Sequence, residues 1–152
     1  MAGILVAEDL PDDVLILKHA FSKAGLTAPL HFVSDGQEAV EYLKGDQVFA
    51  DRKTYPLPAL LLLDLNMPRL NGFDVIEWVR SQAGLCRLPI VVFTSSDQPR
   101  DVNRAYELGA NSYLVKPQAL AKLQQITHHL GEYWLKVNLC PDFGAAAEPG
   151  AA

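Results

Sequence analysis

Five short apolar runs, each followed by a segment with helical spacing, constrain the fold of this chain more than any other feature. In the following segments, apolar residues recur at intervals of three and four, the period of a helix with one buried face. Gly25, Gly45 and Gly109 stand where three of these segments should end. The predicted strands cover residues 4–7, 30–33, 59–63, 88–93 and 113–115, and the last predicted helix covers 118–137.

A strand–helix unit that repeats five times predicts an α/β fold with a parallel sheet. Connections between parallel strands are right-handed, so the helices should cover both faces of the sheet. The run 59–63 is apolar at every position, as expected of a strand that is covered on both sides. The segment 45–58 shows no clean period, and we expect a long loop there.

Size and charge exclude several classes of protein. A chain of 152 residues should form one domain. Thirteen Lys and Arg against 18 Asp and Glu leave a net charge of −5, which argues against a nucleic-acid partner. The first apolar run stops at Glu8 and the longest run, 57–63, is too short to span a bilayer. We therefore expect a soluble, cytoplasmic protein with no membrane partner, and two distant cysteines predict no disulfide framework.

Polar residues follow four of the five predicted strands. Glu8 and Asp9 follow the first strand, Asp64 the third, Thr94 the fourth and Lys116 the fifth. Open parallel sheets bind ligands beyond the carboxyl ends of their strands. If the first and third strands are neighbours, three carboxylates converge there, and a hard cation such as Mg²⁺ would relieve their repulsion. A carboxylate beside Mg²⁺, a hydroxyl and a lysine suits the acceptance of a phosphoryl group.

The motifs at these strand ends resemble those of the receiver domain of two-component response regulators, over about residues 3–134. The matching segments are ILVAED (4–9), LLLDLNMP (61–68), VVFTSS (91–96) and YLVKP (113–117). The resemblance implies a flavodoxin-like, doubly wound (βα)₅ fold with the strand order 2-1-3-4-5. It further implies a receiver domain over 1–137, with 138–152 as a partly disordered extension.

The resemblance also implies a role for each residue at the strand ends. Asp64 would accept a phosphoryl group from a sensor histidine kinase, and Lys116 would pair with that group. Thr94 would supply a switch hydroxyl, and Tyr113 would follow it by changing its rotamer. Glu8, Asp9, Asp64 and the backbone carbonyl of Asn66 would hold Mg²⁺. The peptide bond between Lys116 and Pro117 would be cis.

A narrower resemblance is to stand-alone regulators that accompany bacterial phytochromes and related histidine kinases. It rests on the long 45–58 loop, on the string DLNMP, on ANSY (110–113) and on Tyr133-Trp134. One departure from the receiver pattern is Leu10, where the family places a small polar residue. That change removes a side-chain cap, although Pro11 and two acids still suit the first turn of a helix.

The C-terminal segment carries more apolar residues than one buried helix face requires: Tyr133, Trp134, Leu135, Val137, Leu139 and Phe143. They could pack on their own domain, or they could form a subunit interface, where Trp and Tyr are favoured. Because the family pairs through its fourth and fifth helices, we expect a homodimer that uses Arg100, Arg104, Tyr106, the last helix and the extension.

The residues fit two other classes of function less well. A phosphatase of the haloacid dehalogenase type also uses an aspartate nucleophile with Mg²⁺, but it needs a second aspartate two residues on, where this chain has Asn66. A nucleotide-binding protein would need a glycine-rich loop after the first strand, and none follows it. We therefore expect a signalling module rather than an enzyme. We also expect no output domain, because about fifteen residues follow the last predicted helix.

Overall fold

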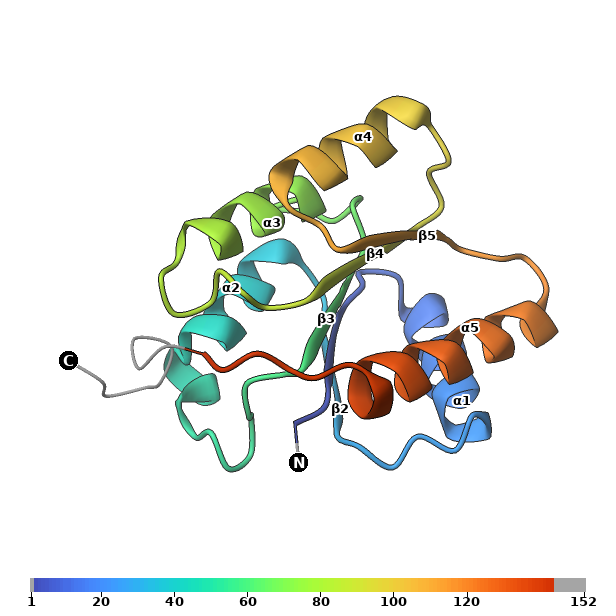
Figure 1. Ribbon diagram of the computed structural model, residues 1–152, viewed down its shortest axis with the longest axis horizontal. Helices are drawn as coiled ribbons and strands as arrows, with labels where there is room; N and C mark the ends of the chain where they lie inside the picture. The colour runs from blue at the N-terminus through green and yellow to red at the C-terminus, as the bar shows by residue number, and fades with distance from the viewer. Residues whose placement is uncertain (1, 144–152) are drawn as a thin grey trace.

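The structure is a computed structural model that describes residues 2–143. Within these residues, five strands alternate with five α-helices (Figure 1). The strands are β1 (Ile4–Ala7), β2 (Leu30–Val33), β3 (Leu60–Leu63), β4 (Ile90–Thr94) and β5 (Ser112–Val115). The helices are α1 (Pro11–Lys23), α2 (Gly36–Lys44), α3 (Gly72–Ser81), α4 (Pro99–Leu108) and α5 (Leu120–Glu132). A 3₁₀ helix, η1 (Gln47–Ala50), and a π-helix, η2 (Tyr133–Val137), complete the elements.

The strands form one parallel sheet in the order β2-β1-β3-β4-β5, which confirms the predicted fold. Ile4 of β1 lies opposite Leu30 of β2 and Leu60 of β3, so β1 is paired on both sides. Successive residues of a strand point to opposite faces. Accordingly, Leu5 and Leu61 belong to one hydrophobic core, whereas Ile4 and Leu60 belong to the other.

Helices cover both faces of the sheet (Figure 1). On one face α1 packs against α5, while α2, α3 and α4 lie side by side on the other. Every residue of the central strands β1, β3 and β4 is buried. This double burial explains why the strand that ends at Asp64 is leucine at every position. The carboxyl ends of β1, β3 and β4 therefore open at one edge of a rigid sheet.

Local signals in the sequence account for the helix ends. Asp35 caps α2 by accepting a hydrogen bond from the backbone N–H of Glu38, and Gly45 ends that helix in the left-handed conformation. Asn71 and Asp74 form a capping box at the start of α3. By contrast, α1 begins with Pro11 and has no side-chain cap at Leu10, as its sequence predicts.

The C-terminal part of the chain differs from the prediction of one long helix. The α-helix ends at Glu132, and the backbone continues as a π-helical turn to Val137. Trp134 and Leu135 pack against the core beneath α1 and α5, and Phe143 packs against the opposite core. The segment therefore contributes to its own domain. Of the extension 138–152, which we expect to be partly disordered, residues 144–152 lie outside the described residues.

The 45–58 segment is more ordered than the long loop expected from its sequence. The segment contains the 3₁₀ helix η1, and Arg52 within it donates hydrogen bonds to the backbone oxygens of Tyr42 and Leu43 at the end of α2.

No peptide bond in the described residues is cis, so the expected cis bond between Lys116 and Pro117 is wrong. The trans form is the intrinsically favoured one even before proline. It is compatible with the 2.8 Å bond from the Lys116 N–H to the Thr94 carbonyl.

Candidate functional site at the carboxyl edge of the sheet

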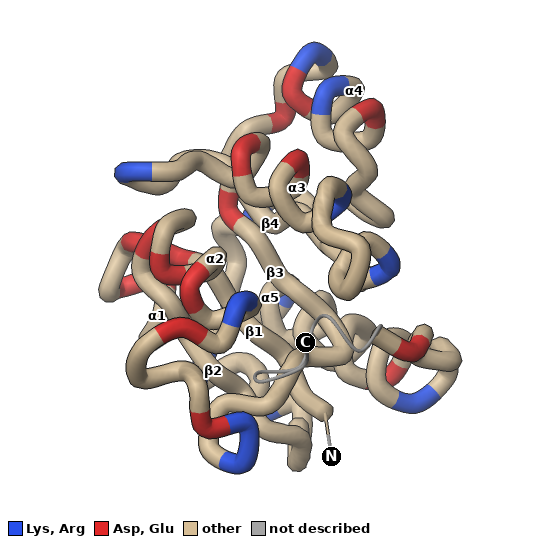
Figure 2. Tube along the Cα trace, turned by 90° about the vertical axis from the view of Figure 1, so that its left-hand side faces the viewer, with Lys and Arg blue, Asp and Glu red and all other residues tan. Residues whose placement is uncertain are grey.

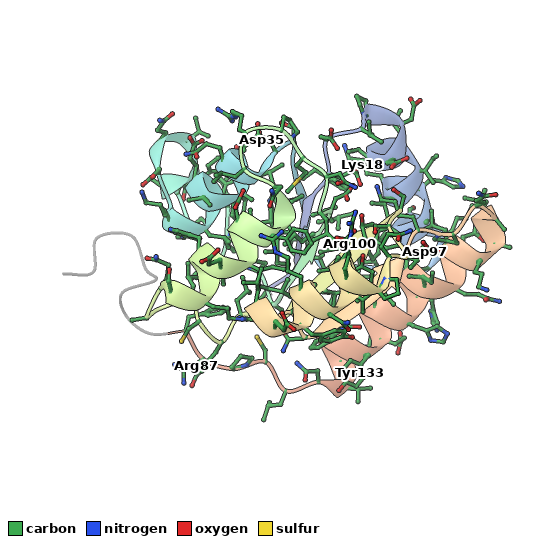
Figure 3. All side chains as sticks on the ribbon, turned by 90° about the horizontal axis from the view of Figure 1, so that it is seen from above. Lys18, Asp35, Arg87, Asp97, Arg100 and Tyr133 are labelled. Atoms are coloured by element: carbon green, nitrogen blue, oxygen red, sulfur yellow. The ribbon has the colours of Figure 1, made fainter. Side chains whose placement is uncertain are left out.

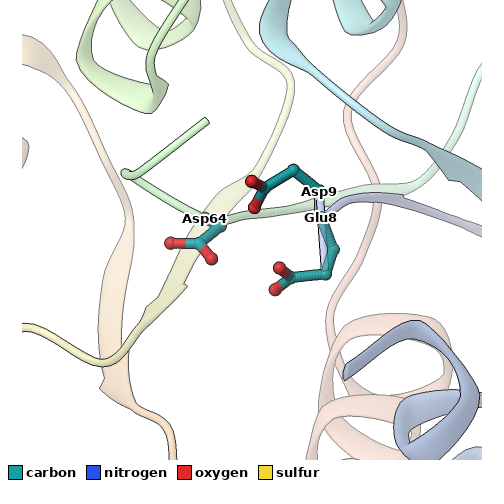
Figure 4. Close-up of side chains that lie close together, drawn as sticks. All are labelled: Glu8, Asp9 and Asp64. Carbon is teal, nitrogen blue, oxygen red and sulfur yellow. The ribbon is translucent and has the colours of Figure 1, made fainter. Parts of the chain in front are cut away.

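The structure brings together the three carboxylates predicted from the strand ends. One oxygen from each of Glu8, Asp9 and Asp64 lies within 4.8 Å of the others. Figure 4 shows these side chains turned toward a common space. The backbone places them, because β1 and β3 are neighbours and the N–H of Asp64 bonds to the Ala7 carbonyl at 3.1 Å. Glu8 and Asp64 are 2% and 5% exposed, so their charges are largely removed from water.

The Lys116 ammonium contacts two of these three carboxylates. Lys116, which follows β5, places its Nζ 2.6 Å from Glu8 and 2.8 Å from Asp64. The same Nζ lies 2.8 Å from the carboxylate of Asp13 in the first turn of α1. The sequence pattern predicts Lys116 at this site, whereas Asp13 is one of the two acids that suit the start of α1. Figure 2 shows several acidic residues near α1, whose first turn carries Asp12 and Asp13.

The pKa shifts follow from burial and from these contacts. Burial raises the pKa of Glu8 to about 7; the charge of Asp64 acts in the same direction, while the hydrogen bond from Lys116 opposes it. Burial alone would lower the pKa of Lys116. However, its hydrogen bonds to Asp13, Asp64 and Glu8 outweigh that effect and leave its pKa above the ordinary value. Lys116 is therefore a cation at neutral pH.

The two further residues predicted for the site lie on β4 and β5: the Thr94 carbonyl accepts the backbone N–H of Lys116 at 2.8 Å, and Tyr113 lies on the strand next to β4. Thr94 at the end of β4 is fully buried, and its Oγ1 has no hydrogen-bond partner among residues 2–143. An unpaired buried hydroxyl is costly and needs an explanation. The Tyr113 hydroxyl donates to the carbonyl of Ser96 at 2.8 Å, so this side chain is tied to the β4–α4 loop. Burial raises the pKa of Tyr113, whose hydroxyl therefore remains a donor at neutral pH.

An open cleft of about 310 Å³ lies here, and its charged lining residues are Asp9, Asp13, Asp64 and Lys116. Leu10, Asn66 and Ser95 complete the lining. The Asn66 N–H donates to Asp64 Oδ1 at 3.2 Å. A hard divalent cation such as Mg²⁺ prefers carboxylate and carbonyl oxygens, and the oxygens gathered here fit that preference. The cluster could thus hold a metal ion, with space beside it for a small anionic group.

Three neighbours of the site were missed as site residues: Asp13, Ser95 and Ser96. Ser95 and Ser96 directly follow Thr94, so their position after a strand was the available signal. Asp13 gave a weaker signal, because an acid in the first turn of a helix normally serves the helix dipole. Only the packing of α1 against the rest of the domain shows which side chains can reach Lys116.

The fold and this constellation define a class of protein. The model of the response regulator receiver domain family matches residues 4–128, and the chain belongs to that family. The comparisons lend no support to the phosphatase alternative, and residue 66 remains an asparagine that cannot act as a general acid. No helix within residues 2–143 is long and apolar enough to cross a membrane.

Among individual proteins, the chain is similar to Response regulator Rcp1 from Synechocystis, with 31% identity over 91% of this chain and 92% of Rcp1. A Mn²⁺-bound structure of Rcp1 matches with a TM-score of 0.82 and 30% identity over 93% and 99% of the two chains. The phosphorylated cyanobacterial phytochrome response regulator RcpA gives a TM-score of 0.84 and 31% identity over the same shares. Response regulator RPA3017, from red light signalling in R. palustris, gives a TM-score of 0.87 and 38% identity. The match covers 93% of this chain and 99% of that chain.

Proposed function

We propose that Asp64 accepts a phosphoryl group from a phosphohistidine of a sensor kinase. The observation that carries this proposal is the buried Asp64 carboxylate, which contacts the Lys116 ammonium at 2.8 Å in a cleft shared with two further carboxylates. In the transfer, an Asp64 oxygen forms a bond to phosphorus as the phosphorus–nitrogen bond of the phosphohistidine breaks. The released imidazole nitrogen retains the electron pair of that bond.

The residues around Asp64 have complementary parts in this step. Lys116 neutralises charge on the phosphoryl oxygens. The unpaired Thr94 hydroxyl donates to one of those oxygens, which explains why it has no partner in the present structure. Tyr113 then changes rotamer and passes the change to the β4–α4 loop, to which its hydroxyl is bonded. Glu8, Asp9, Asp64 and the Asn66 carbonyl would hold Mg²⁺, which supplies charge neutralisation when bound.

Intact-mass measurement tests this proposal. The protein is incubated with Mg²⁺ and acetyl phosphate, a small phosphoryl donor. We expect the mass of one phosphoryl group to be added in an acid-stable, base-labile linkage. The adduct should be absent from Asp64→Asn and should require the divalent cation. An equal adduct on Asp64→Asn would place the acceptor elsewhere.

We propose a histidine kinase of the phytochrome type as the donor. The support is the likeness over nearly the whole chain to RcpA, a cyanobacterial phytochrome response regulator, and to RPA3017, a response regulator in red light signalling. Purified kinase labelled on its histidine should pass phosphate to this chain faster than a kinase from an unrelated pathway.

We further propose a cytoplasmic location, where such kinases meet ATP. The receiver domain would cover 1–137, with 138–152 as an extension.

We propose a homodimer through α4, α5 and the extension. Arg100, Arg104 and Tyr106 of α4 are exposed, and Figure 3 places Arg100 on this helix and Tyr133 beyond α5. Tyr133, Val137 and Leu139 are 50%, 72% and 93% exposed, an unusual cost for apolar side chains in water. Sedimentation with and without beryllofluoride, a phosphoryl mimic, should show a dimer. A monomer at high concentration in both conditions would contradict the proposal.

A further inference from the structure

An ion pair outside the cleft ties the β3–α3 loop to the start of α2. Arg69 Nε donates to Asp35 Oδ2 at 3.0 Å, and Arg69 Nη2 donates to Asp35 Oδ1 at 3.0 Å. Two parallel bonds between a guanidinium and a carboxylate combine strength with a defined orientation. Asp35 is only 9% exposed, and Figure 3 shows it where α2 begins. Neither residue lines the cleft that contains Asp64.

The backbone of Arg69 is strained. Its φ is +65°, in the left-handed region that residues with a side chain seldom adopt. Strain of this kind persists only where surrounding contacts impose it, and it clusters near functional sites. The two bonds to Asp35 are the contacts that hold the Arg69 side chain. The loop thus adopts a costly conformation that the ion pair helps to maintain.

The α2 end of this contact is fixed. Asp35 Oδ1 also accepts the backbone N–H of Glu38 at 2.8 Å, which locks the carboxylate into its role as the helix cap. Beside it, Gly36 allows the loop to approach very closely, because a Cβ at this position would lie 2.0 Å from the carbonyl oxygen of Leu70. The loop therefore rests on a helix end that cannot readily move away.

The other end of the same loop carries Asn66, whose backbone carbonyl is the proposed metal ligand. Asn66 lies between Asp64 and Arg69, and its N–H bonds to Asp64 Oδ1 at 3.2 Å. The loop is closed by the N–H of Gly72, which donates to the Leu65 carbonyl at 2.9 Å. In such a short closed loop, the orientation of the Asn66 peptide depends on the conformation at Arg69.

We infer that the Asp35–Arg69 ion pair positions the metal site, by holding the β3–α3 loop so that the Asn66 backbone faces the carboxylates. Asp35 and Arg69 are positioning residues, since they act through the loop and touch neither the cation nor the phosphoryl group. The inference rests on the proposed function, in which the Asn66 carbonyl and three carboxylates bind the cation.

The test is the affinity for Mn²⁺, measured from the electron paramagnetic resonance signal of the free ion. Asp35→Asn keeps a good helix cap but loses the charge that binds Arg69. Arg69→Gly removes both the ion pair and the strain of a positive φ. We expect both to weaken Mn²⁺ binding about three- to tenfold, less than the 10–100-fold effect of groups that bond a metal ligand directly. Arg69→Lys keeps the positive charge but cannot make the two parallel bonds of a guanidinium. Its affinity for Mn²⁺ should lie between those of the two variants and that of the wild type.

The matched control is Lys44→Met, which removes the exposed 3.3 Å ion pair with Asp46 near the other end of α2 and should bind Mn²⁺ like the wild type. Amide hydrogen exchange gives a second readout, in which Asn66 should exchange faster in Arg69→Gly even without metal. Unchanged Mn²⁺ affinity in both Asp35→Asn and Arg69→Gly, with normal binding by the wild type, overturns the inference alone. Failure of the wild type to bind Mn²⁺ overturns the proposed metal site and this inference with it.

Discussion

The Lys116 ammonium lies 2.8 Å from the carboxylate of Asp64, although 52 positions in the chain separate them. The pair exists because β5 and β3 both end at the same edge of the sheet, on either side of β4. The same ammonium also contacts Glu8 and Asp13. One cation therefore balances three carboxylates, which makes this site sensitive to any change of charge.

Lys116→Met should destabilise the metal-free protein. The substitution leaves the buried carboxylates of Glu8 and Asp64 without their cation, and breaking a buried ion pair in this way costs about 3 kcal/mol. Urea unfolding without divalent ions measures the loss, and added Mg²⁺ should restore more stability to the variant than to the wild type. Lys136→Met removes the exposed pair with Glu132 and should leave the free energy of unfolding nearly unchanged. Equal losses in the two variants would contradict this account of Lys116.

Thr94→Val should stabilise the protein and impair its phosphorylation. Removing an unpaired buried hydroxyl relieves a desolvation penalty of about 1–3 kcal/mol, so the free energy of unfolding should rise by about 1 kcal/mol. The lost donor should slow phosphorylation by acetyl phosphate about tenfold, which equals about 1.4 kcal/mol in the barrier.

Thr127→Val is the matched control for Thr94→Val. Thr127 is equally buried, but its single hydroxyl proton is within hydrogen-bond reach of two carbonyls, those of Ala20 and Gln124. Its substitution should therefore lower the free energy of unfolding by about 1 kcal/mol and leave the phosphorylation rate unchanged. If Thr94→Val lowers the free energy of unfolding as Thr127→Val should, the Thr94 hydroxyl is satisfied in solution. An unchanged phosphorylation rate in Thr94→Val would contradict its proposed role.

Asp13→Asn should accelerate phosphorylation. Asp13 competes for the Lys116 ammonium and adds negative charge beside the incoming phosphoryl group. Removing about 1 kcal/mol of repulsion corresponds to roughly a fivefold faster reaction with acetyl phosphate. The neighbouring Asp12→Asn, at an exposed position of the same helical turn, should have no such effect. A slower Asp13→Asn would mean that Asp13 orients Lys116 productively instead of competing for it.

Tyr42 should make the free energy of unfolding fall as the pH becomes alkaline. Burial raises its pKa in the folded protein to about 12, from an ordinary value of 10.0. Because the folded pKa is raised, the stabilisation is complete below pH 10 and is lost as the pH rises toward 12. This one group should contribute a slope of up to about 1.4 kcal/mol per pH unit in that range. The free energy of unfolding, measured with urea at several pH values, should fall less steeply with pH in Tyr42→Phe than in the wild type. Parallel plots against pH for variant and wild type would contradict the assignment.

Residues that follow strands could be predicted from the sequence, because a parallel sheet gathers its carboxyl ends at one edge. Glu8, Asp64 and Lys116 come together for that reason alone. Side chains that reach the site from helices could not be placed in this way. The contact of Asp13 with Lys116 depends on the rotation of α1, which tertiary packing decides.

Long-range pairs between loops were beyond the sequence patterns as well. Nothing in the local sequence connects Asp35 with Arg69, since each residue has an ordinary local reading as a helix cap or as an exposed cation. The C-terminal segment shows another limit. Its apolar residues indicated either self-packing or an interface, and the structure divides them, with Trp134 packed inward and Val137 left exposed.

The measurement that tests the central claim most directly is the identification of the phosphorylated residue. The protein is treated with acetyl phosphate and Mg²⁺, reduced with borohydride, which converts an aspartyl phosphate to homoserine, and sequenced by mass spectrometry. The account predicts homoserine at position 64 and unmodified Glu8 and Asp9, with no conversion when the divalent cation is withheld. Conversion at Asp9 instead of Asp64, or no conversion in folded protein that binds Mg²⁺, would contradict it.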